Sequence, residues 1–380
     1  MKKRIIGFCL AAALILSVIV PSFASDKAIS GNTSTENELI SLVNNMLPFI
    51  EMEKEQYGMK DVDFSTLYLG NEIPAYVLGI DGELSKPDIS YFPIMSNDKW
   101  VATVMAFYSK SGKLNIQISS YYVQEYAESS CKDKNFALIF DRDGAYFYAD
   151  GDVELAAAST YDMPSLSSIK EHPDMAVQST ANLRPQHVLT VVRDNIVSTQ
   201  SDERDPFETY QYLNVPTVKQ AKDSQQCWAA CIASARGYYG VSTTIDDVYN
   251  FSGVKKYNGA TIYVANNTLV KYGFEENSTW YWRDSLSWYQ LRTEIVFNES
   301  PLFTACYYGT NSDGAEIGHA VLLRGFLVYR NVSQLGAISY MDPATGTYVA
   351  SSVSNQHDYN YVASGNVGPF EMSTFIAIRN

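Results

Sequence analysis

The segment of residues 223–240 places the strongest constraint on what this chain can fold into. From Cys227 it reads Cys-Trp-Ala-Ala-Cys-Ile-Ala-Ser-Ala-Arg, with Asp223-Ser224 ahead of it as a helix-cap signal and Gly237 and Gly240 closing it. Alanine favours a helix, and its small side chain lets neighbouring elements approach closely. The segment therefore predicts a tightly packed helix.

Length and composition define the broad class of the protein. The chain has 380 residues, of which 46% are hydrophobic and 18% are charged. These fractions exclude disorder, collagen and coiled coil, and the length favours more than one domain. The formal net charge of −14 repels phosphate backbones and therefore argues against nucleic acid as a partner.

The first residues are typical of a secretory signal peptide. A basic start, Lys2-Lys3-Arg4, precedes an apolar run from Ile5 to Val20, and small residues follow. A signal anchor is the alternative, but the run is short for a membrane span and polar sequence follows at once. We expect a signal peptide at residues 1–24 and a mature protein that is secreted, extracellular or on the cell surface, without a membrane segment.

Residues 25–200 predict an α+β domain built on an antiparallel meander. A helix with Thr35 as N-cap is expected to run until Pro48 disrupts it. Strand-like segments follow in two hairpins with turns at Ser111-Gly112 and Asp141–Gly144. The hairpin strands are Trp100–Phe107 with Leu114–Ile118, and Phe136–Phe140 with Ala145–Tyr148.

A polar, charged run then marks a domain boundary. It extends from Ser198 to Pro206, and we place a linker at residues 201–211. The second domain, residues 212–380, has its helix first and its strands later. There is no internal repeat at solenoid periods.

Four cysteines remain after the signal peptide, namely Cys131, Cys227, Cys231 and Cys306. An even number in an oxidising compartment permits two disulfides. However, Cys227 and Cys231 share one helix face with poor geometry for bonding each other, and a chain of this length needs no cross-links to fold. Free cysteines are the better prediction.

Cys227 has the features of a nucleophile. It lies in the first turn of the predicted helix, where free N–H groups and the helix dipole favour a thiolate. His319 starts an apolar strand and Asp342 ends the next one, and adjacent antiparallel strands can bring the two together. An imidazole takes the thiol proton and a carboxylate orients the imidazole, as nucleophilic catalysis requires. The alternative is a buried core cysteine.

These residues resemble the papain-like cysteine peptidases of bacteria. The matching motifs are Val215-Pro216 to Gln220, Cys227–Cys231, Gly318–Val321 and Asp342-Pro343 with Gly346. The resemblance covers Tyr212 to Asn380 and is strongest to the staphopain-like branch and to bacteriocin-transporter peptidase domains. It implies a papain-like fold, in which the nucleophile helix packs on an antiparallel half-barrel.

The resemblance also implies an oxyanion donor ahead of the nucleophile. Gln220 is the candidate, with the backbone N–H of Cys227 as second donor. The interval from Gln220 to Cys227 is one residue longer than is usual in the family. Gln225 and Gln226 therefore remain rivals.

The remaining notable residues have structural interpretations. Cys231 and Cys306 are expected in the core, and His172, His187 and His357 in structural or surface positions. Residues 141–144 have the wrong spacing for a calcium loop, and no metal or other cofactor is predicted. The aromatic segments Trp280–Trp282 and Trp288-Tyr289 suit either a substrate cleft or the core.

The sequence as a whole predicts a secreted thiol peptidase that hydrolyses protein or peptide substrates through an acyl-enzyme on Cys227. Residues 25–200 are expected to dock on the catalytic domain as a pro-region, which makes the protein a zymogen. A permanent targeting domain is the alternative for that part. For the whole chain, the alternatives are a non-catalytic binding protein on the same scaffold and another acyl transfer or amide hydrolysis with the same triad.

Overall fold

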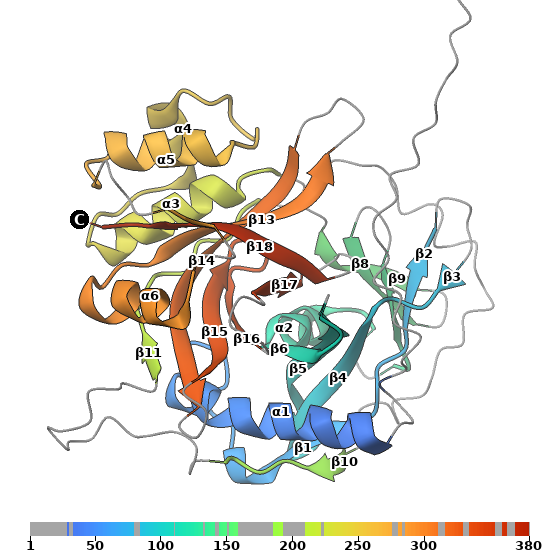
Figure 1. Ribbon diagram of the computed structural model, residues 1–380. Coiled ribbons are helices and arrows are strands. Elements are labelled where there is room, and N and C mark those ends of the chain that lie inside the picture. Colours follow the sequence, from blue (N-terminus) through green and yellow to red (C-terminus); the bar gives the residue numbers. More distant parts are fainter. Residues whose placement is uncertain are drawn as a thin grey trace, which may run out of the picture.

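The computed structural model describes most of the chain from residue 33 onward (Figure 1). The predicted signal peptide and residues 201–209 of the predicted linker lie outside the described residues. The described residues are 29, 33–79, 84–109, 111–131, 134–140, 144–149, 152–158, 185–192, 210–221, 224–275, 280–282, 286–310, 316–329, 334–353, 359–362 and 369–379.

Helix α1, Thr33–Met52, corrects two predictions. Thr35 lies inside the helix and is not its N-cap, and Pro48 does not end it. Proline has no N–H and leaves the carbonyl four residues earlier without its helical donor. That carbonyl belongs to Asn44, and it accepts from the backbone N–H of Val192 at 3.5 Å. A distant segment thus replaces the hydrogen bond that Pro48 removes.

The described N-terminal strands form two groups. The first comprises β1 Leu67–Gly70, β4 Ile89–Ser96, β5 Lys99–Tyr108, β6 Leu114–Ser119 and β10 Pro185–Val188. The second is a separate sheet of β2 Ala75–Leu78, β3 Leu84–Ser85, β7 Ala137–Phe140, β8 Gly144–Ala149 and β9 Asp152–Ala158. A short 3₁₀ helix, Phe64–Thr66, precedes β1, and helix α2, Tyr121–Glu128, follows β6.

Both predicted hairpins are present in these strands. β5 pairs antiparallel with β6 around Gly112, whose φ of +74° suits a glycine in the turn. β7 pairs antiparallel with β8, although residues 141–143 of the predicted turn lie outside the described residues.

The C-terminal part contains helices first and strands afterwards, apart from the short β11 and β12. Its helices are α3 Cys227–Tyr238, α4 Ile245–Ser252, α5 Ile262–Lys271, α6 Trp288–Arg292 and a π-helix at Thr293–Phe297. Its strands are β11 Tyr210–Tyr212, β12 Trp280–Trp282, β13 Leu302–Thr310, β14 Glu316–Tyr329, β15 Gln334–Asp342, β16 Thr347–Ser352, β17 Asn360–Val362 and β18 Pro369–Ala377.

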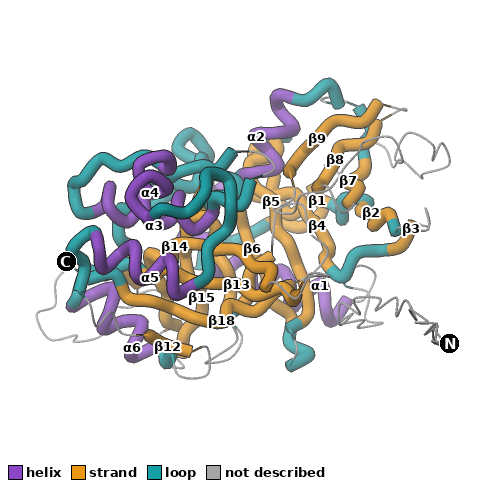
Figure 2. Tube along the Cα trace, turned by 90° about the horizontal axis from the view of Figure 1, so that it is seen from above, coloured by secondary structure: helices purple, strands orange, loops and turns teal. Residues whose placement is uncertain are grey.

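One continuous sheet joins the two parts of the chain. Its described strands follow the order β10-β1-β4-β5-β6-β16-β15-β14-β13-β18-β12, with β11 beside β14 and β17 beside β18. The parts meet where β6 pairs antiparallel with β16, at Ile118 with Ala350 and at Gln117 with Ser351. Figure 2 shows the strands of this sheet running through the molecule. Helices α3, α4 and α5 lie together on the side of the molecule where the chain ends. The chain is a mixed α+β protein with antiparallel pairing throughout this sheet.

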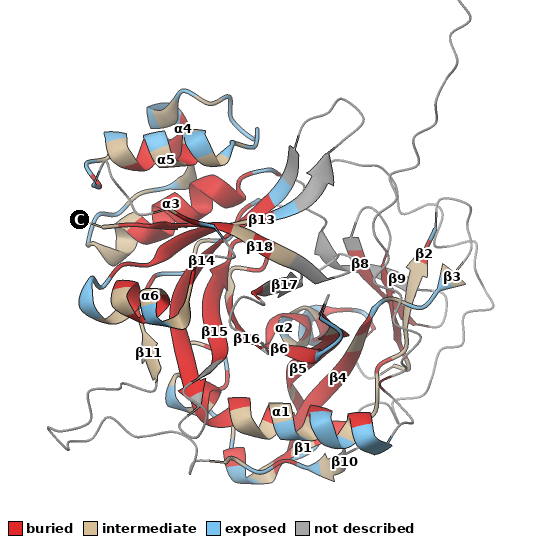
Figure 3. Cartoon of the chain, viewed as in Figure 1, coloured by how far each residue is buried: buried red, intermediate tan, exposed pale blue. Residues whose placement is uncertain are grey.

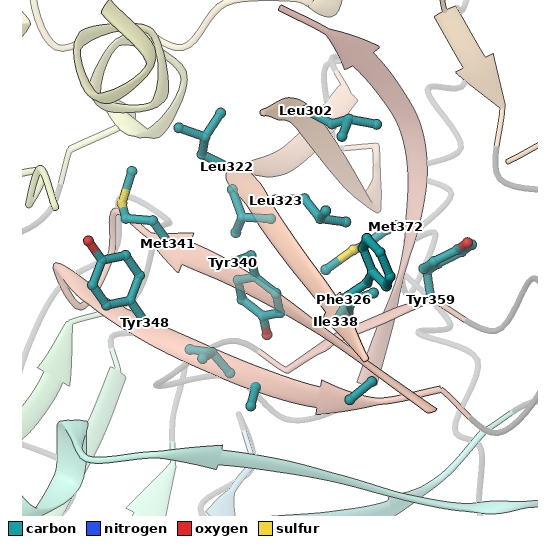
Figure 4. Packing of buried hydrophobic residues seen from close by; sticks show 14 of the residues in the cluster. Leu302, Leu322, Leu323, Phe326, Ile338, Tyr340, Met341, Tyr348, Tyr359 and Met372 are labelled. Carbon is teal, nitrogen blue, oxygen red and sulfur yellow. The ribbon is translucent and has the colours of Figure 1, made fainter. Parts of the chain in front are cut away.

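The hydrophobic core also extends across both parts. One cluster contains buried side chains from α1, from β4–β6, from α3 and from β13–β16 (Figure 3). Figure 4 shows its centre, where Leu322, Leu323 and Phe326 of β14 lie beside Tyr340 and Met341 of β15. A second cluster lies around α2, β7 and β8 and includes Cys131.

Helix α3 is the most buried described helix of the C-terminal part, as its alanines predict. Every residue from Cys227 to Ala235 is buried. Near its end the helix approaches another segment so closely that a Cβ on Gly237 would lie 2.6 Å from Cγ of Pro216. The predicted tight packing of this helix is therefore confirmed, and Cys227 is held at its first turn.

Candidate active site

Cys227 is the first residue of α3, but the helix starts without the predicted cap. Gln226 occupies the N-cap position and makes no side-chain capping bond. The hydroxyl of Ser224 donates to the carbonyl oxygen of Ala221 at 2.7 Å, and Asp223 lies outside the described residues. No described side chain caps α3, so N–H groups of its first turn remain free close to Cys227.

His319 and Asp342 are brought together by neighbouring strands. β14 carries His319, β15 ends at Asp342, and the two strands pair antiparallel. The His319 Nε2 lies 2.8 Å from Oδ1 of Asp342, and both side chains are buried. The predicted proximity of these two residues is therefore present in the fold.

The turn after β15 fixes the Asp342 carboxylate. The Asp342 Oδ1 also accepts a hydrogen bond from the backbone N–H of Ala344 at 2.9 Å. The backbone carbonyl of Asp342 accepts from the backbone N–H of Gly346 at 2.7 Å. Gly346 has a φ of +69°, and a Cβ there would lie 2.7 Å from Cβ of Lys219. A glycine is therefore required to close this turn against the chain that leads to Gln220.

The pKa of His319 indicates how the imidazole interacts with the thiol. Burial lowers this pKa, but the charge of Cys227 and hydrogen bonds to Asp342 and Cys227 raise it to about 10. Since Nε2 faces Asp342, the Nδ1 is the nitrogen left for Cys227. Helix α3, which starts at Cys227, packs on β14, which carries His319. The raised pKa favours the protonated, imidazolium form of His319 in the folded protein.

Gln220 lies in a loop tied to the same turn. Its backbone N–H donates to the carbonyl of Pro343 at 2.9 Å, and its Nε2 donates to the carbonyl of Ser224 at 3.1 Å. The two rival glutamines have other bonds. Gln225 Oε1 accepts from the backbone of Gly259 at 2.8 Å, and Gln226 Oε1 accepts from Ala221 at 3.1 Å. The role of Gln220 as oxyanion donor stays a prediction.

The other cysteines are free and buried, as predicted. Cys306 pairs with His319 in the β13–β14 register, and Cys231 lies one helical turn after Cys227. Burial, followed by nearby negative charge, raises the pKa of both Cys231 and Cys306. These two thiols therefore stay protonated and are poor nucleophiles.

One contact at this site comes from the N-terminal part of the chain, and no sequence motif predicts it. Lys219, next to Gln220, has its Nζ 3.5 Å from a carboxylate oxygen of Glu125 and 5.6 Å from the centre of the Tyr121 ring. Both partners belong to α2. Tyr121 is buried, and burial, followed by the charges of Glu125 and Asp342 among others, raises its pKa. Helix α2 therefore lies against the loop that carries Gln220.

The aromatic segments divide between core and surface. Tyr281 is buried and donates to Glu294 at 2.6 Å, whereas Trp282 and Tyr289 are 59% and 63% exposed. Among the other histidines, His187 lies on β10 beside β1, in the N-terminal half of the sheet. His172 and His357 lie outside the described residues.

No group of three or more His, Cys, Asp or Glu side chains among the described residues is arranged to hold a metal ion. No helix within them is long and apolar enough to cross a membrane.

The described site thus combines a cysteine at a helix start with a histidine and a carboxylate on two paired strands, the residue types that nucleophilic catalysis by a thiol uses. Comparison with models of known families found no match. The chain is similar to staphopain B of Staphylococcus aureus, with 21% identity over 72% of this chain and 73% of the relative. Staphopain B of strain NCTC 8325 is 20% identical over the same shares. This similarity confirms the resemblance to papain-like cysteine peptidases.

One solved structure shows a weaker likeness to this chain. The peptidase domain of Streptococcus ComA, a bifunctional ABC transporter involved in a quorum-sensing pathway, has 15% identity and a TM-score of 0.29. The match covers 44% of this chain and all of that domain. A likeness of this degree supports no further conclusion.

Proposed function

We propose that the protein is a secreted thiol peptidase that hydrolyses peptide bonds through an acyl-enzyme on Cys227. The observation that carries this proposal is the 2.8 Å contact between His319 and Asp342 beside the uncapped start of α3. His319 acts as base and acid, Asp342 orients it, and Gln220 stabilises the oxyanion. The comparison with staphopains favours peptide hydrolysis over other acyl transfers.

The proposed reaction has two stages, acylation of Cys227 and hydrolysis of the acyl-enzyme. The Cys227 thiolate attacks the peptide carbonyl carbon, a C–S bond forms, and the carbonyl oxygen becomes an oxyanion. Imidazolium at His319 then gives its proton to the leaving amine as the C–N bond breaks. Neutral His319 next takes a proton from a water molecule as that water attacks the thioester carbonyl. The C–S bond then breaks, which releases the acid product and restores the Cys227 thiolate beside the His319 imidazolium.

We also propose that residues 25–200 restrain this site as a pro-region. Two observations support this role. Helix α2 contacts Lys219 beside Gln220, and β6 continues the peptidase sheet at β16. The similarity to staphopain B covers 72% of this chain, which is more than residues 212–380 make up. It therefore extends into the N-terminal part. A permanent targeting domain remains the alternative, and activity of the uncut chain distinguishes the two.

Labelling with an epoxide inhibitor of thiol peptidases tests the catalytic assignment. The expected result is a single adduct on Cys227, and loss of both labelling and peptidase activity in Cys227→Ser. His319→Ala should lose activity to a similar extent, and the double variant should lose little more, because the residues act as one unit. Cys131→Ser is the matched control, since it changes a buried thiol of the second cluster, and it should keep full activity.

Two results would contradict this assignment. One is an adduct on Cys231 or Cys306, and the other is near-normal turnover in His319→Ala, after which His357 is the next residue to test. Secretion is tested separately by sequencing the N-terminus of the protein recovered from culture medium. We expect it to start near Ser25.

A further inference from the structure

Gln226 lies directly before the nucleophile and ties the preceding loop to the start of α3. Its side chain is buried, and its Oε1 accepts from the backbone N–H of Ala221 at 3.1 Å and from the hydroxyl of Ser224 at 3.2 Å. Because a backbone N–H only donates, the atom that faces Ala221 must be the amide oxygen. The Gln226 side chain therefore closes the loop across residues 221–226.

Gln220 is connected to Gln226 through Ser224. The Gln220 Nε2 donates to the carbonyl of Ser224. The single proton of the Ser224 hydroxyl is shared between the carbonyl of Ala221 at 2.7 Å and Oε1 of Gln226 at 3.2 Å. The Gln220 Oε1 is buried and accepts no hydrogen bond from a described residue, so the Ser224 bond alone orients this amide. One N–H of the amide is engaged in that bond, which leaves the second N–H for an oxyanion.

We propose that Gln226 is a positioning residue that holds Gln220 in its oxyanion-binding orientation. The inference rests on the proposed peptidase function. The loop between Gln220 and Cys227 is one residue longer than the usual papain-like interval, and a longer loop has more conformational freedom. The hydrogen bond that Gln226 accepts from Ala221, together with the shared proton of Ser224, offsets that freedom. A displacement of about 1 Å at such a site costs up to about a hundredfold in rate.

Two substitutions separate positioning from direct donation. Gln226→Met keeps the side-chain volume but removes the oxygen that accepts the hydrogen bonds. Gln226→Glu keeps an accepting oxygen and cannot donate when ionised. Two readouts are compared at their pH-independent plateaus. The first is the inhibition constant of a peptide aldehyde, whose addition to the thiol creates an oxyanion. The second is the alkylation rate of Cys227 with iodoacetamide, which creates none.

We expect Gln226→Met to weaken aldehyde binding and kcat by about tenfold to a hundredfold, with the alkylation rate unchanged. Gln226→Glu should restore most of the aldehyde affinity. The matched control is Gln290→Met, because Gln290 Oε1 also accepts from a backbone N–H and a hydroxyl, both of Ser287, at 2.7 and 2.8 Å. It should leave both readouts unchanged.

A double variant tests whether Gln226 acts through Gln220. Gln220→Met with Gln226→Met should bind the aldehyde as weakly as Gln220→Met alone. A larger loss, unchanged aldehyde affinity in Gln226→Met, or no recovery in Gln226→Glu would each overturn the inference. Absence of Cys227 alkylation in the unsubstituted protein would contradict the proposed function instead, so the two failures are distinguishable.

Discussion

Substitution of Phe49 tests whether the N-terminal helix and the peptidase core unfold together. Phe49 of α1 is fully buried, and its ring stacks on Tyr212 with centroids 4.5 Å apart and planes 16° apart. A buried Phe→Ala change costs about 3–5 kcal/mol, of which the stacked pair accounts for about 0.5–1.5 kcal/mol. If unfolding of α1 exposes α3, this cost accelerates labelling of Cys231 by at least about a hundredfold.

The assay is thiol labelling of the native protein, followed by mass spectrometry of each cysteine peptide. A Cys227→Ser background removes self-cleavage and the reactive thiol. Cys231 reports on α3, and Cys131 reports on the second cluster, where its thiol lies 3.7 Å from the carbonyl oxygen of Phe147. Both thiols are fully buried, so each becomes labelled only when its surroundings open.

A control at Phe147 gives the reverse pattern. Phe147→Ala removes an equally buried ring from β8, and it should accelerate labelling of Cys131 more than that of Cys231. Phe49→Ala should accelerate Cys231 more than Cys131. An unchanged labelling rate of Cys231 in Phe49→Ala would refute the reasoning, because α1 would then be an independent unit.

Two further predictions concern pH and processing. Because the pKa of His319 is raised to about 10, its protonated form is favoured in the folded protein, and peptidase activity should persist through neutral pH and fall as pH rises toward 10. Asp342→Asn removes the charge that helps raise the pKa of His319. The upper limb of the pH–activity profile should therefore move to lower pH. An upper limb that stays in place would contradict the role of Asp342 as the partner of His319. Active enzyme added to full-length Cys227→Ser protein should cut it between about residues 181 and 211, and activity should rise when uncut wild-type chain is processed. Full activity in the uncut chain, unchanged by deletion of residues 25–200, would instead favour the targeting role.

The sequence predicted the elements of the site because their signals are local. The alanines after Cys227 indicate a packed helix, and the apolar run after His319 indicates a strand. Two strands that follow each other along the chain commonly pair, which predicts the proximity of His319 and Asp342. These inferences need only short stretches of residues.

The features that the sequence did not predict depend on distant partners. Pro48 stays within α1 because Asn44 finds its hydrogen-bond donor in Val192. The contact of Lys219 with Glu125 and the pairing of β6 with β16 likewise join segments without a shared motif. No local pattern specifies such partners, because many strands and charged residues compete for each one.

The pairing of β6 with β16 has a consequence for how the chain folds as it is made. The backbone N–H of Ile116 donates to the hydroxyl of Ser352, which lies 236 positions later. Contacts of such long sequence separation form slowly, and synthesis starts at the N-terminus. β6 therefore remains an open edge until nearly the whole chain has emerged. Asn115 and Gln117 give this unpaired edge strand polar side chains, which reduces its tendency to pair with other nascent chains.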